Sequence, residues 1–332
     1  IQELLFALRN LYEMFNARAG YPVLVFHDGL SARTRERIVL AAPNRLWFFL
    51  VHDWGPGGLP PGIGRVTDEE GAQSGGQKPW ASGSGRSGFG VGYRAQSRFR
   101  SGPLFSHPAA KRFDYLWGLD SDSLFPGLLS SDPFEELHSN PDLVLGYRYL
   151  TMTSSASVRH LWDHTELYGM REGLTLDGAR PGSGPRARYH FLAQFLTASP
   201  GYESVQWNNK VVMTDCEILR VAFFKEGSRY WDYFTYLDSL DGFWSHRWGD
   251  HAVRALGTGL ALWEEDRASW ANGAIGRGST SQPRTFVMDH PYAHQRWCSC
   301  ATGNVSCVLV HDPKNGTIRP DLVHLRSAVW TC

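Results

Sequence analysis

The chain has 332 residues, of which 42% are hydrophobic and 13% aromatic, so it can bury a large core as one big domain or as two fused lobes. Its 33 basic and 33 acidic residues balance, which argues against nucleic acid or another polyanion as a partner. The sequence contains no apolar run long enough to span a bilayer and no signal peptide. Because Ile1 falls within a predicted amphipathic helix, we expect any membrane anchor to lie outside this chain.

The N-terminal residues alternate between predicted helices and predicted strands. Leucine and aromatic residues at helical spacing predict a helix over residues 1–16. Apolar runs predict strands over residues 21–26 and 45–51, with Ser31 as the N-cap of a charged helix, Ala32–Ala41, between them. This order is typical of a parallel sheet wrapped by helices.

Paired carboxylates follow the next predicted strand. Residues 55–92 are dominated by Gly, Ser and Pro, which favours a flexible surface insertion over a lid. The apolar strand predicted over residues 113–119 then ends at Asp120-Ser121-Asp122. At the C-terminal edge of a sheet, two such carboxylates repel each other unless a cation lies between them, and divalent metals that bridge phosphates use this arrangement. The alternative is a solvated turn, since Asp and Ser are ordinary turn residues.

Further helices and a strand are predicted in the second half of the chain. Asp132 is expected to cap a helix that begins at Pro133. The other expected elements are a strand over residues 143–147, a helix over 156–168, an exposed loop over 173–188, a helix over 215–240 that breaks near Gly227, and a helix over 251–262. The loop 241–250 mixes aromatic and acidic residues, a pattern that suits sugar rings but is more often the edge of a core.

Cysteines and glycosylation signals gather near the C-terminus. The four cysteines there are Cys298, Cys300, Cys307 and Cys332, and N-glycosylation sequons begin at Asn304 and Asn315. We expect a lumenal protein with two disulfides among these four, and with Cys216 either free or paired with one of them. The alternative is a zinc site built on Cys298-Ser-Cys300, whose spacing is not that of the usual zinc knuckles.

A series of short sequence blocks runs along most of the chain. The blocks lie at residues 21–26, 92–94, 98–102, 107–108, 113–117, 132–134, 215–218, 233–238, 242–244 and 247–250. In order and spacing they resemble the fungal Golgi α-1,2-mannosyltransferases, glycosyltransferase family 15, over about residues 13–298. The spacing matches without a gap from Tyr93 to Asp120, and Arg247-Trp-Gly-Asp250 is a hallmark of that family.

The resemblance implies an α/β fold of the GT-A glycosyltransferase type, with a mixed central sheet flanked by helices. In that fold a Rossmann-like nucleotide-binding part is merged with an acceptor-binding part. We therefore expect one catalytic domain over residues 1–332, with a nucleotide-binding part at 1–130, an acceptor-binding part at 131–297 and a Cys-rich tail at 298–332.

The resemblance also implies an activity and a location. The activity is a metal-dependent, retaining transfer of α-mannose from GDP-mannose to a hydroxyl of a mannoside or glycan acceptor, in an α-1,2 linkage. The implied cofactor is Mn²⁺, or another divalent cation. The implied location is the Golgi lumen, with the full-length protein held in the membrane as a type II protein by an anchor absent from this chain.

Carried over by position, the resemblance assigns metal and donor ligands. Asp120, Asp122 and His290 would hold the metal, with His294 as the second candidate for the histidine. Arg98 is expected to bind the donor diphosphate together with the two aspartates. The alternative for His290 is a surface imidazole before a proline.

Catalytic and acceptor roles fall on a second set of residues. Glu217 matches the candidate nucleophile of the family, and Tyr93 matches an active-site tyrosine. Glu217 would either form a covalent intermediate or stabilise charge while the acceptor attacks from the front face. Acceptor binding is expected from Arg247, Trp248 and Asp250.

Each of these roles has a structural alternative. Glu217 is otherwise a first-turn helix carboxylate that interacts with the helix dipole, and Tyr93 a packing residue. Asp250 is expected to cap the following helix as well as to touch the acceptor. Arg98 and Arg247 are the residues that would otherwise pair with internal carboxylates.

Several departures from the family pattern keep two rival functions open. The family has Glu where this chain has Asp120 and Asn where it has Asp215, and the chain begins after the family's opening strand. One rival is a glycosyltransferase that uses another nucleotide sugar. The other is a non-catalytic, lectin-like or scaffold protein that kept the fold.

Overall fold

The computed structural model describes ten segments of the chain. They are residues 2–51, 91–121, 123–174, 176, 190–198, 205–271, 284–288, 293–294, 296–297 and 308–309. The predicted metal ligands Asp122 and His290 lie outside these residues, as do most of the 55–92 insertion, the four C-terminal cysteines and both sequons.

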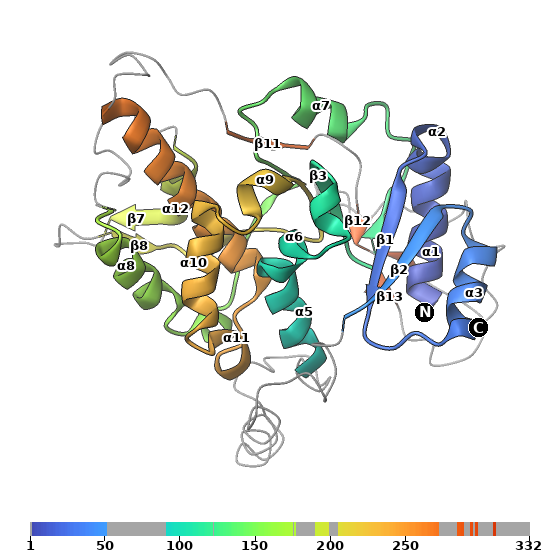
Figure 1. Cartoon of the computed structure of the whole chain (residues 1–332), viewed down its shortest axis with the longest axis horizontal. Coiled ribbons are helices and arrows are strands. Elements are labelled where there is room, and N and C mark those ends of the chain that lie inside the picture. The colour runs from blue at the N-terminus through green and yellow to red at the C-terminus, as the bar shows by residue number, and fades with distance from the viewer. Residues whose placement is uncertain are drawn as a thin grey trace.

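The N-terminal part contains two parallel strands with helices packed on one face (Figure 1). Its elements are α1 (Gln2–Leu11), a π-helical turn (Tyr12–Asn16), α2 (Ala17–Ala19), β1 (Pro22–His27), α3 (Ala32–Ala41) and β2 (Arg45–Leu50). Leu8 of α1 and Ile38 of α3 pack together over Val23 of β1. Ser31 caps α3, because its hydroxyl accepts a hydrogen bond from the Thr34 amide at 3.1 Å. The predicted order of elements and the Ser31 cap are confirmed.

A four-stranded mixed sheet forms the centre of the molecule. Its strands, in spatial order, are β11 (Thr285–Val287), β5 (Leu145–Tyr147), β10 (Cys216–Arg220) and β3 (Tyr115–Leu119). β10 is antiparallel to both of its neighbours, whereas β11 and β5 are parallel. This sheet confirms the mixed α/β class. The sheet takes β3 from residues 1–130 and its other strands from 131–297, and the division between those two parts stays a prediction.

The helix predicted over residues 215–240 is wrong at its start. Residues 216–220 form β10, followed by α9 (Val221–Phe224), a turn in which Gly227 has φ of 87°, and α10 (Arg229–Asp238). Ile218 faces one hydrophobic cluster and Leu219 the opposite one, so successive side chains are buried on the two faces of the sheet. Burial on both sides favours a central strand over a helix here. The predicted break near Gly227 is confirmed.

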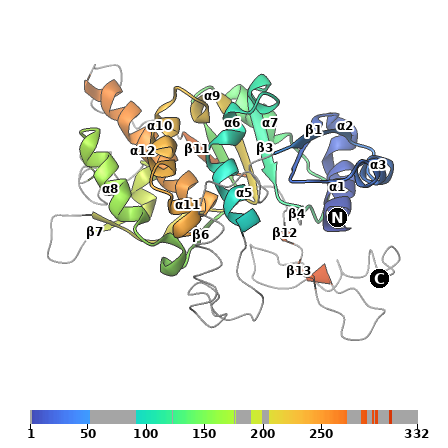
Figure 2. The same cartoon turned by 60° about the horizontal axis from the view of Figure 1, so that its bottom comes forward.

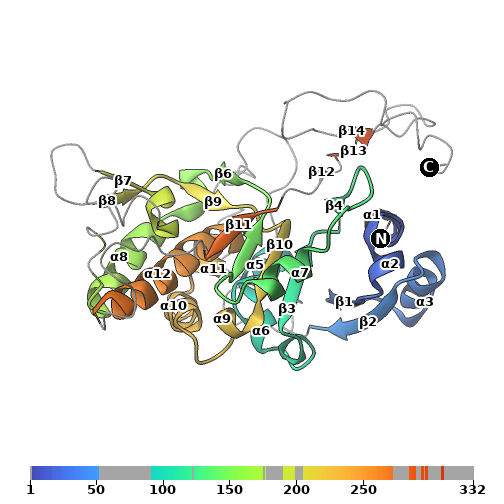
Figure 3. The same ribbon diagram turned by 90° about the horizontal axis from the view of Figure 1, so that it is seen from above.

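Helices cover both faces of the central sheet (Figures 1 and 3). On one face, Leu145 and Leu219 belong to a large hydrophobic cluster shared with α6 (Pro103–Ser106), α8 (Leu161–Arg171), α10, α11 (Gly242–Ser245) and α12 (Asp250–Ala271). On the other face, Ile218 packs with Leu11 of α1 and Leu137 of α7 (Pro133–Ser139). The helix α5 (Val91–Ser101) contacts α11 and α12. The layered α/β arrangement follows from these two apolar faces.

Short elements complete the described fold. They are the 3₁₀ turns Ala110–Arg112, Ser155–Val158 and Phe191–Phe195, and the strands β4 (Ser123–Leu124), β6 (Leu150–Met152), β7 (Leu196–Ala198), β8 (Val205–Trp207), β9 (Lys210–Val212), β12 (Ala293–His294), β13 (Arg296–Trp297) and β14 (Val308–Leu309). Figure 2 shows that β7 and α8 lie at the opposite end of the molecule from β1.

Two local expectations concern the helices α7 and α8. Asp132 caps α7, because its carboxylate accepts a hydrogen bond from the Phe134 amide at 2.9 Å, which confirms that expectation. The helix predicted over 156–168 is instead α8, which begins at Leu161 after a 3₁₀ turn. Within the described parts of the chain, no helix combines the length and apolar character needed to cross a bilayer.

Candidate active site

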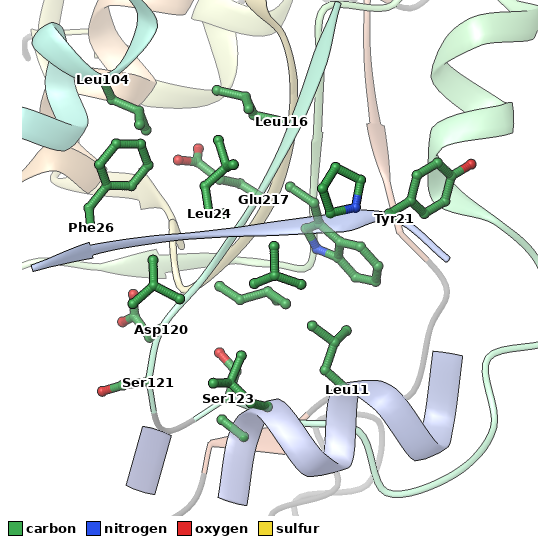
Figure 4. Close-up of a pocket in the computed structure, with 18 of the residues that line it drawn as sticks. Leu11, Tyr21, Leu24, Phe26, Leu104, Leu116, Asp120, Ser121, Ser123 and Glu217 are labelled. Carbon is green, nitrogen blue, oxygen red and sulfur yellow. The ribbon is translucent and has the colours of Figure 1, made fainter. Parts of the chain in front are cut away.

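A cavity of about 860 Å³ lies between the N-terminal strands and the central sheet. Residues of α1, β1 and β3 contribute to its wall, together with residues of α5, α7 and β10. The polar side chains in this wall include Arg100, Asp120, Ser121 and Glu217. Figure 4 shows the last three of these together with apolar side chains of β1 and α1. The fold therefore brings two of the predicted site carboxylates to one cavity.

Asp120 follows β3 directly and is one third exposed, with a side-chain exposure of 34%. Its amide donates a hydrogen bond to the carbonyl of Asp215 at 3.2 Å, which ties the end of β3 to the start of β10. One carboxylate oxygen, Oδ1, accepts a hydrogen bond from Arg100 Nη1. A hard, partly exposed oxygen donor at a cavity wall is chemically suited to a divalent cation.

The other two predicted metal ligands, Asp122 and His290, lie outside the described residues. Among those residues, no three His, Cys, Asp or Glu side chains gather closely enough to hold a metal. His294, the second histidine candidate, lies on β12, and its backbone is in register with Ser123 of β4. The backbone of β12 therefore runs beside β4, which begins three residues after Asp120.

Glu217 is the second residue of β10, lies opposite Gly118 of β3, and is 1% exposed. Its carboxylate accepts two hydrogen bonds from Arg254, with Nε–Oε2 at 2.9 Å and Nη2–Oε1 at 3.2 Å. Arg100 Nη2 lies 3.8 Å from Oε1. Burial raises the pKa of the Glu217 carboxyl, and the two guanidinium groups oppose that rise. Because Glu217 lies on a strand, the alternative of a first-turn helix carboxylate is wrong.

Arg100, in the last turn of α5, links three acidic side chains. Besides its contacts with Asp120 and Glu217, its Nε lies 3.3 Å from Asp250 Oδ2, and its Nη2 donates to the carbonyl of Thr214. The side chain is only 14% exposed. Burial lowers the pKa of this guanidinium, but the three carboxylates raise it by more. One largely buried cation thus holds carboxylates from the end of β3, from β10 and from α12.

Asp250 is the first residue of α12 and not its N-cap, which corrects that expectation. The amide of Val253 donates to the carbonyl of Gly249 at 3.2 Å. The Asp250 carboxylate instead accepts a hydrogen bond from Thr214 Oγ1 at 2.9 Å and pairs with Arg100. Burial raises the pKa of Asp250, but Arg100 and the other polar neighbours lower it by more, so the net shift is downward.

Tyr93 and Arg247 lie against each other. The Arg247 guanidinium carbon is 5.2 Å from the centroid of the Tyr93 ring, and both side chains are partly buried. Arg247 has φ of 61°, a left-handed backbone that costs a residue with a side chain about 1 kcal/mol or more. Burial and the nearby Asp250 raise the pKa of Tyr93. The structure therefore places these two residues together, with Asp250 close by.

Arg98 is engaged by an internal carboxylate. Its Nε and Nη2 atoms lie 2.5 Å and 2.7 Å from the two carboxylate oxygens of Asp238 on α10. This bidentate geometry occupies the planar fork with which an arginine would grip a diphosphate. The structure therefore supports the internal-pair alternative for Arg98 over the donor-binding role.

Trp248 belongs to the hydrophobic core, which corrects its assignment to the acceptor site. The residue is 1% exposed, and its indole Nε1 donates to the carbonyl of Arg159 at 2.8 Å. A Cβ added to Gly242 would lie 2.2 Å from the Trp248 ring, so the indole fits against bare backbone. An acceptor sugar has no surface of this ring to stack on.

Three residues of the site were not predicted from the sequence: Arg100, Thr214 and Arg254. Arg100 lies two positions after Arg98 in the same sequence block, and the sequence alone does not distinguish which of the two faces the carboxylates. Arg254 follows Asp250 by four positions on α12, a spacing that places both on one helix face. That spacing was a usable signal. Thr214 had none, because its role depends on the tertiary contact with Asp250.

The comparisons with known proteins agree in sequence and in fold. Residues 1–305 match the sequence profile of the family described as glycolipid 2-alpha-mannosyltransferase. O-glycoside alpha-1,2-mannosyltransferase homolog 4 of Schizosaccharomyces pombe is 24% identical over 282 residues, which cover 78% of this chain and 62% of that protein. Probable mannosyltransferase KTR3 of Saccharomyces cerevisiae is 27% identical over 175 residues, covering 53% of this chain and 39% of that protein. The chain thus spans less than two thirds of the length of either relative.

Solved structures support the fold. Core-mannan synthase A from Aspergillus fumigatus, solved in a form with Mn and GDP, superposes with a TM-score of 0.64 at 21% identity, over 88% of this chain and 71% of that one. The mannosyltransferase Ktr4p from Saccharomyces cerevisiae gives a TM-score of 0.64 at 21% identity, over 91% and 69%. Because the family profile covers nearly the whole sequence, the chain belongs to the glycolipid 2-alpha-mannosyltransferase family.

Proposed function

We propose that this protein is a metal-dependent, retaining glycosyltransferase that transfers α-mannose from GDP-mannose to a hydroxyl of a mannoside or glycan acceptor, in an α-1,2 linkage. The observation that carries the proposal is the meeting of Asp120 and Glu217 at one cavity, joined through Arg100. Family membership supports the reaction class, and the relatives' names support the mannosyl group and the linkage.

We assign the metal to Asp120, Asp122 and His290. A divalent cation such as Mn²⁺ would offset the negative charge of the departing diphosphate when it is bound there. The partly exposed carboxylate of Asp120 at the cavity wall is a suitable hard ligand. The Mn and GDP found with core-mannan synthase A support this choice of cation and nucleotide.

We assign the anionic group beside the anomeric carbon to Glu217. Its carboxylate either attacks that carbon as the diphosphate oxygen leaves, or stabilises the positive charge that develops there. Both roles require the ionised form. Burial favours the neutral acid and raises the pKa of Glu217, whereas the guanidinium groups of Arg254 and Arg100 favour the ionised form and limit that rise.

We place the acceptor near Tyr93, Arg247 and Asp250. The aromatic ring and the guanidinium that packs against it offer a flat surface and hydrogen-bond donors, both of which suit a sugar. The left-handed backbone of Arg247 supports a functional role, since such conformations gather at functional sites. Trp248 is left out of this set because it is buried.

We also propose that the protein works in the lumen of the secretory pathway, in the Golgi. The two sequons and the C-terminal cysteines support this location. Expression in a fungal host, followed by endoglycosidase treatment, tests it. A mobility shift that disappears in an Asn304→Gln, Asn315→Gln double variant is the expected result, and an absent shift contradicts the lumenal location.

The test of the proposed function is calorimetric titration of GDP and UDP into the protein, with Mn²⁺ and with EDTA. We expect GDP to bind with Mn²⁺ present, and we expect EDTA or Asp120→Asn to weaken that binding at least about tenfold. EDTA removes the cation, and Asp120→Asn replaces a charged carboxylate ligand by a neutral amide. Asp163→Asn is the matched control, since its carboxylate is 67% exposed on α8, outside the cavity wall.

The outcomes separate the rival functions. Binding of UDP in preference to GDP would keep the reaction class and overturn the mannose donor. If neither nucleotide binds to the folded protein with Mn²⁺, the enzyme assignment is wrong and a scaffold role takes its place. Transfer of mannose from GDP-mannose to a mannoside, with the linkage read by NMR, then tests the α-1,2 bond.

A further inference from the structure

Arg254 makes contacts that reach well beyond a simple ion pair. It is 0% exposed, and its guanidinium binds both oxygens of Glu217, at 2.9 Å and 3.2 Å. Its Nη1 donates to the hydroxyl of Tyr230 at 2.8 Å, and its Nη2 donates to the main-chain carbonyl of Arg100 at 2.8 Å. All three nitrogen atoms of the group are therefore engaged by fixed partners.

Aromatic rings hold the Arg254 guanidinium in place. Its central carbon lies 4.8 Å from the ring centroid of Phe105, 5.0 Å from that of Phe224 and 5.3 Å from that of Tyr230. Tyr230 is itself fixed, because its hydroxyl donates to the carbonyl of Ser101 at 2.8 Å. A cation packed against several rings gains cation–π attraction and loses the freedom to change rotamer.

This degree of burial needs an explanation. Removing a guanidinium and a carboxylate from water is costly, and a pair of hydrophobic residues of similar volume often gives equal or greater stability. A planar guanidinium, however, fixes both the position and the plane of a carboxylate, which a lysine ammonium does not do. The contacts of Arg254 are thus better matched to orienting Glu217 than to stabilising the fold.

We propose that Arg254 is the positioning residue that fixes the Glu217 carboxylate for transfer, and that through the Arg100 main chain it also sets the distance between Glu217 and the donor side of the site. The inference rests on the proposed function. Arg254 touches no substrate in this scheme. It acts through Glu217 and through the carbonyl of Arg100, the residue whose side chain contacts Asp120.

The first test is Arg254→Lys, which keeps the charge and removes the planar fork. We measure kcat and KM for mannosyl transfer from GDP-mannose with Mn²⁺, and the affinity for GDP by calorimetry. We expect kcat to fall at least about tenfold, because small displacements of a reacting group cost up to about a hundredfold in rate. We expect KM and the GDP affinity to change less than about threefold, since Arg254 makes no donor contact.

The matched control is Arg220→Lys. Arg220 ends the same strand and donates to the carbonyls of Leu143 and Leu137, at 2.8 Å and 2.7 Å, without touching Glu217. We expect this variant to lower Tm while kcat stays within about twofold of wild type, as for a purely structural arginine. A loss of Tm in Arg254→Lys with an unchanged kcat would overturn the inference.

A second measurement does not need activity. Thermal unfolding of Arg254→Lys, Glu217→Gln and the double variant forms a double-mutant cycle. If the two side chains interact directly, the Tm decrease of the double variant is smaller than the sum of the two single decreases. Additive decreases overturn the inference. If the wild-type protein transfers no mannose but the Tm decreases are less than additive, only the proposed function is contradicted. If the wild-type protein is active and Arg254→Lys keeps its kcat, only the inference about Arg254 is contradicted.

Discussion

Gly118 of β3 lies directly opposite Glu217 of β10, and its missing side chain leaves the space in which Glu217 and Arg100 approach each other. A Cβ at Gly118 would lie 3.4 Å from Glu217 Cγ and 3.4 Å from Arg100 Nη2. At these distances the space beside Gly118 accommodates one methyl group but no larger side chain.

Substitutions at Gly118 should therefore have graded effects. Gly118→Ala adds a methyl group at ordinary contact distance, and we expect kcat and Tm close to those of wild type. Gly118→Val adds two more methyl carbons, which must push Glu217 or Arg100 aside, so we expect kcat to fall at least about tenfold. Steady-state kinetics with both variants measure these effects. Equal kcat for the two variants would show that the side chains around Gly118 are not tightly packed.

Replacing Trp248 tests its place in the core. Trp248→Phe loses the hydrogen bond to the Arg159 carbonyl and some buried area, so we expect the free energy of unfolding to fall by about 1–3 kcal/mol. Urea unfolding measures this loss, and acceptor KM should stay unchanged in the folded variant. A raised acceptor KM with an unchanged free energy of unfolding would instead support a role for Trp248 in acceptor binding.

Substitutions at Arg98 and Asp238 distinguish a structural role of Arg98 from a role in binding the donor diphosphate. If the pair is structural, Arg98→Ala and Asp238→Ala lower stability by similar amounts, with a coupling energy of about 1 kcal/mol in the double variant. Neither single change should alter GDP affinity. A diphosphate contact would instead make Arg98→Ala weaken GDP binding on its own, as calorimetry would detect.

Asp250 should make the free energy of unfolding depend on pH in the acid range. Its folded pKa is lowered below the ordinary value of 3.8, so the stability it contributes is complete above that value and is lost as pH falls through the folded pKa. We expect Asp250→Asn to cost about 1–3 kcal/mol near neutral pH, with a difference from wild type that narrows below about pH 4. Urea unfolding across that range measures it, and a difference independent of pH contradicts the assignment.

Local signals in the sequence were enough for the starts of α3 and α7 and for the end of β3, but not for the starts of α8 and α12. Ser31 and Asp132 cap their helices as predicted, because the capping bond joins residues two or three positions apart. The strand β10 was missed because its residues also fit a helical pattern, and only the sheet partners on both sides decide between the two. The Arg254–Glu217 pair spans 37 positions, so no local pattern in the sequence contains it.

β1 and β3 each keep an edge that bears no strand partner within the described residues: β1 pairs with β2 only, and β3 with β10 only. Backbone N–H and C=O groups on such edges are ready to pair with extended polypeptide from another molecule. Both strands also contribute to the wall of the candidate-site cavity, so a strand added to either edge would lie beside that cavity. Light scattering at rising protein concentration measures whether such self-association occurs.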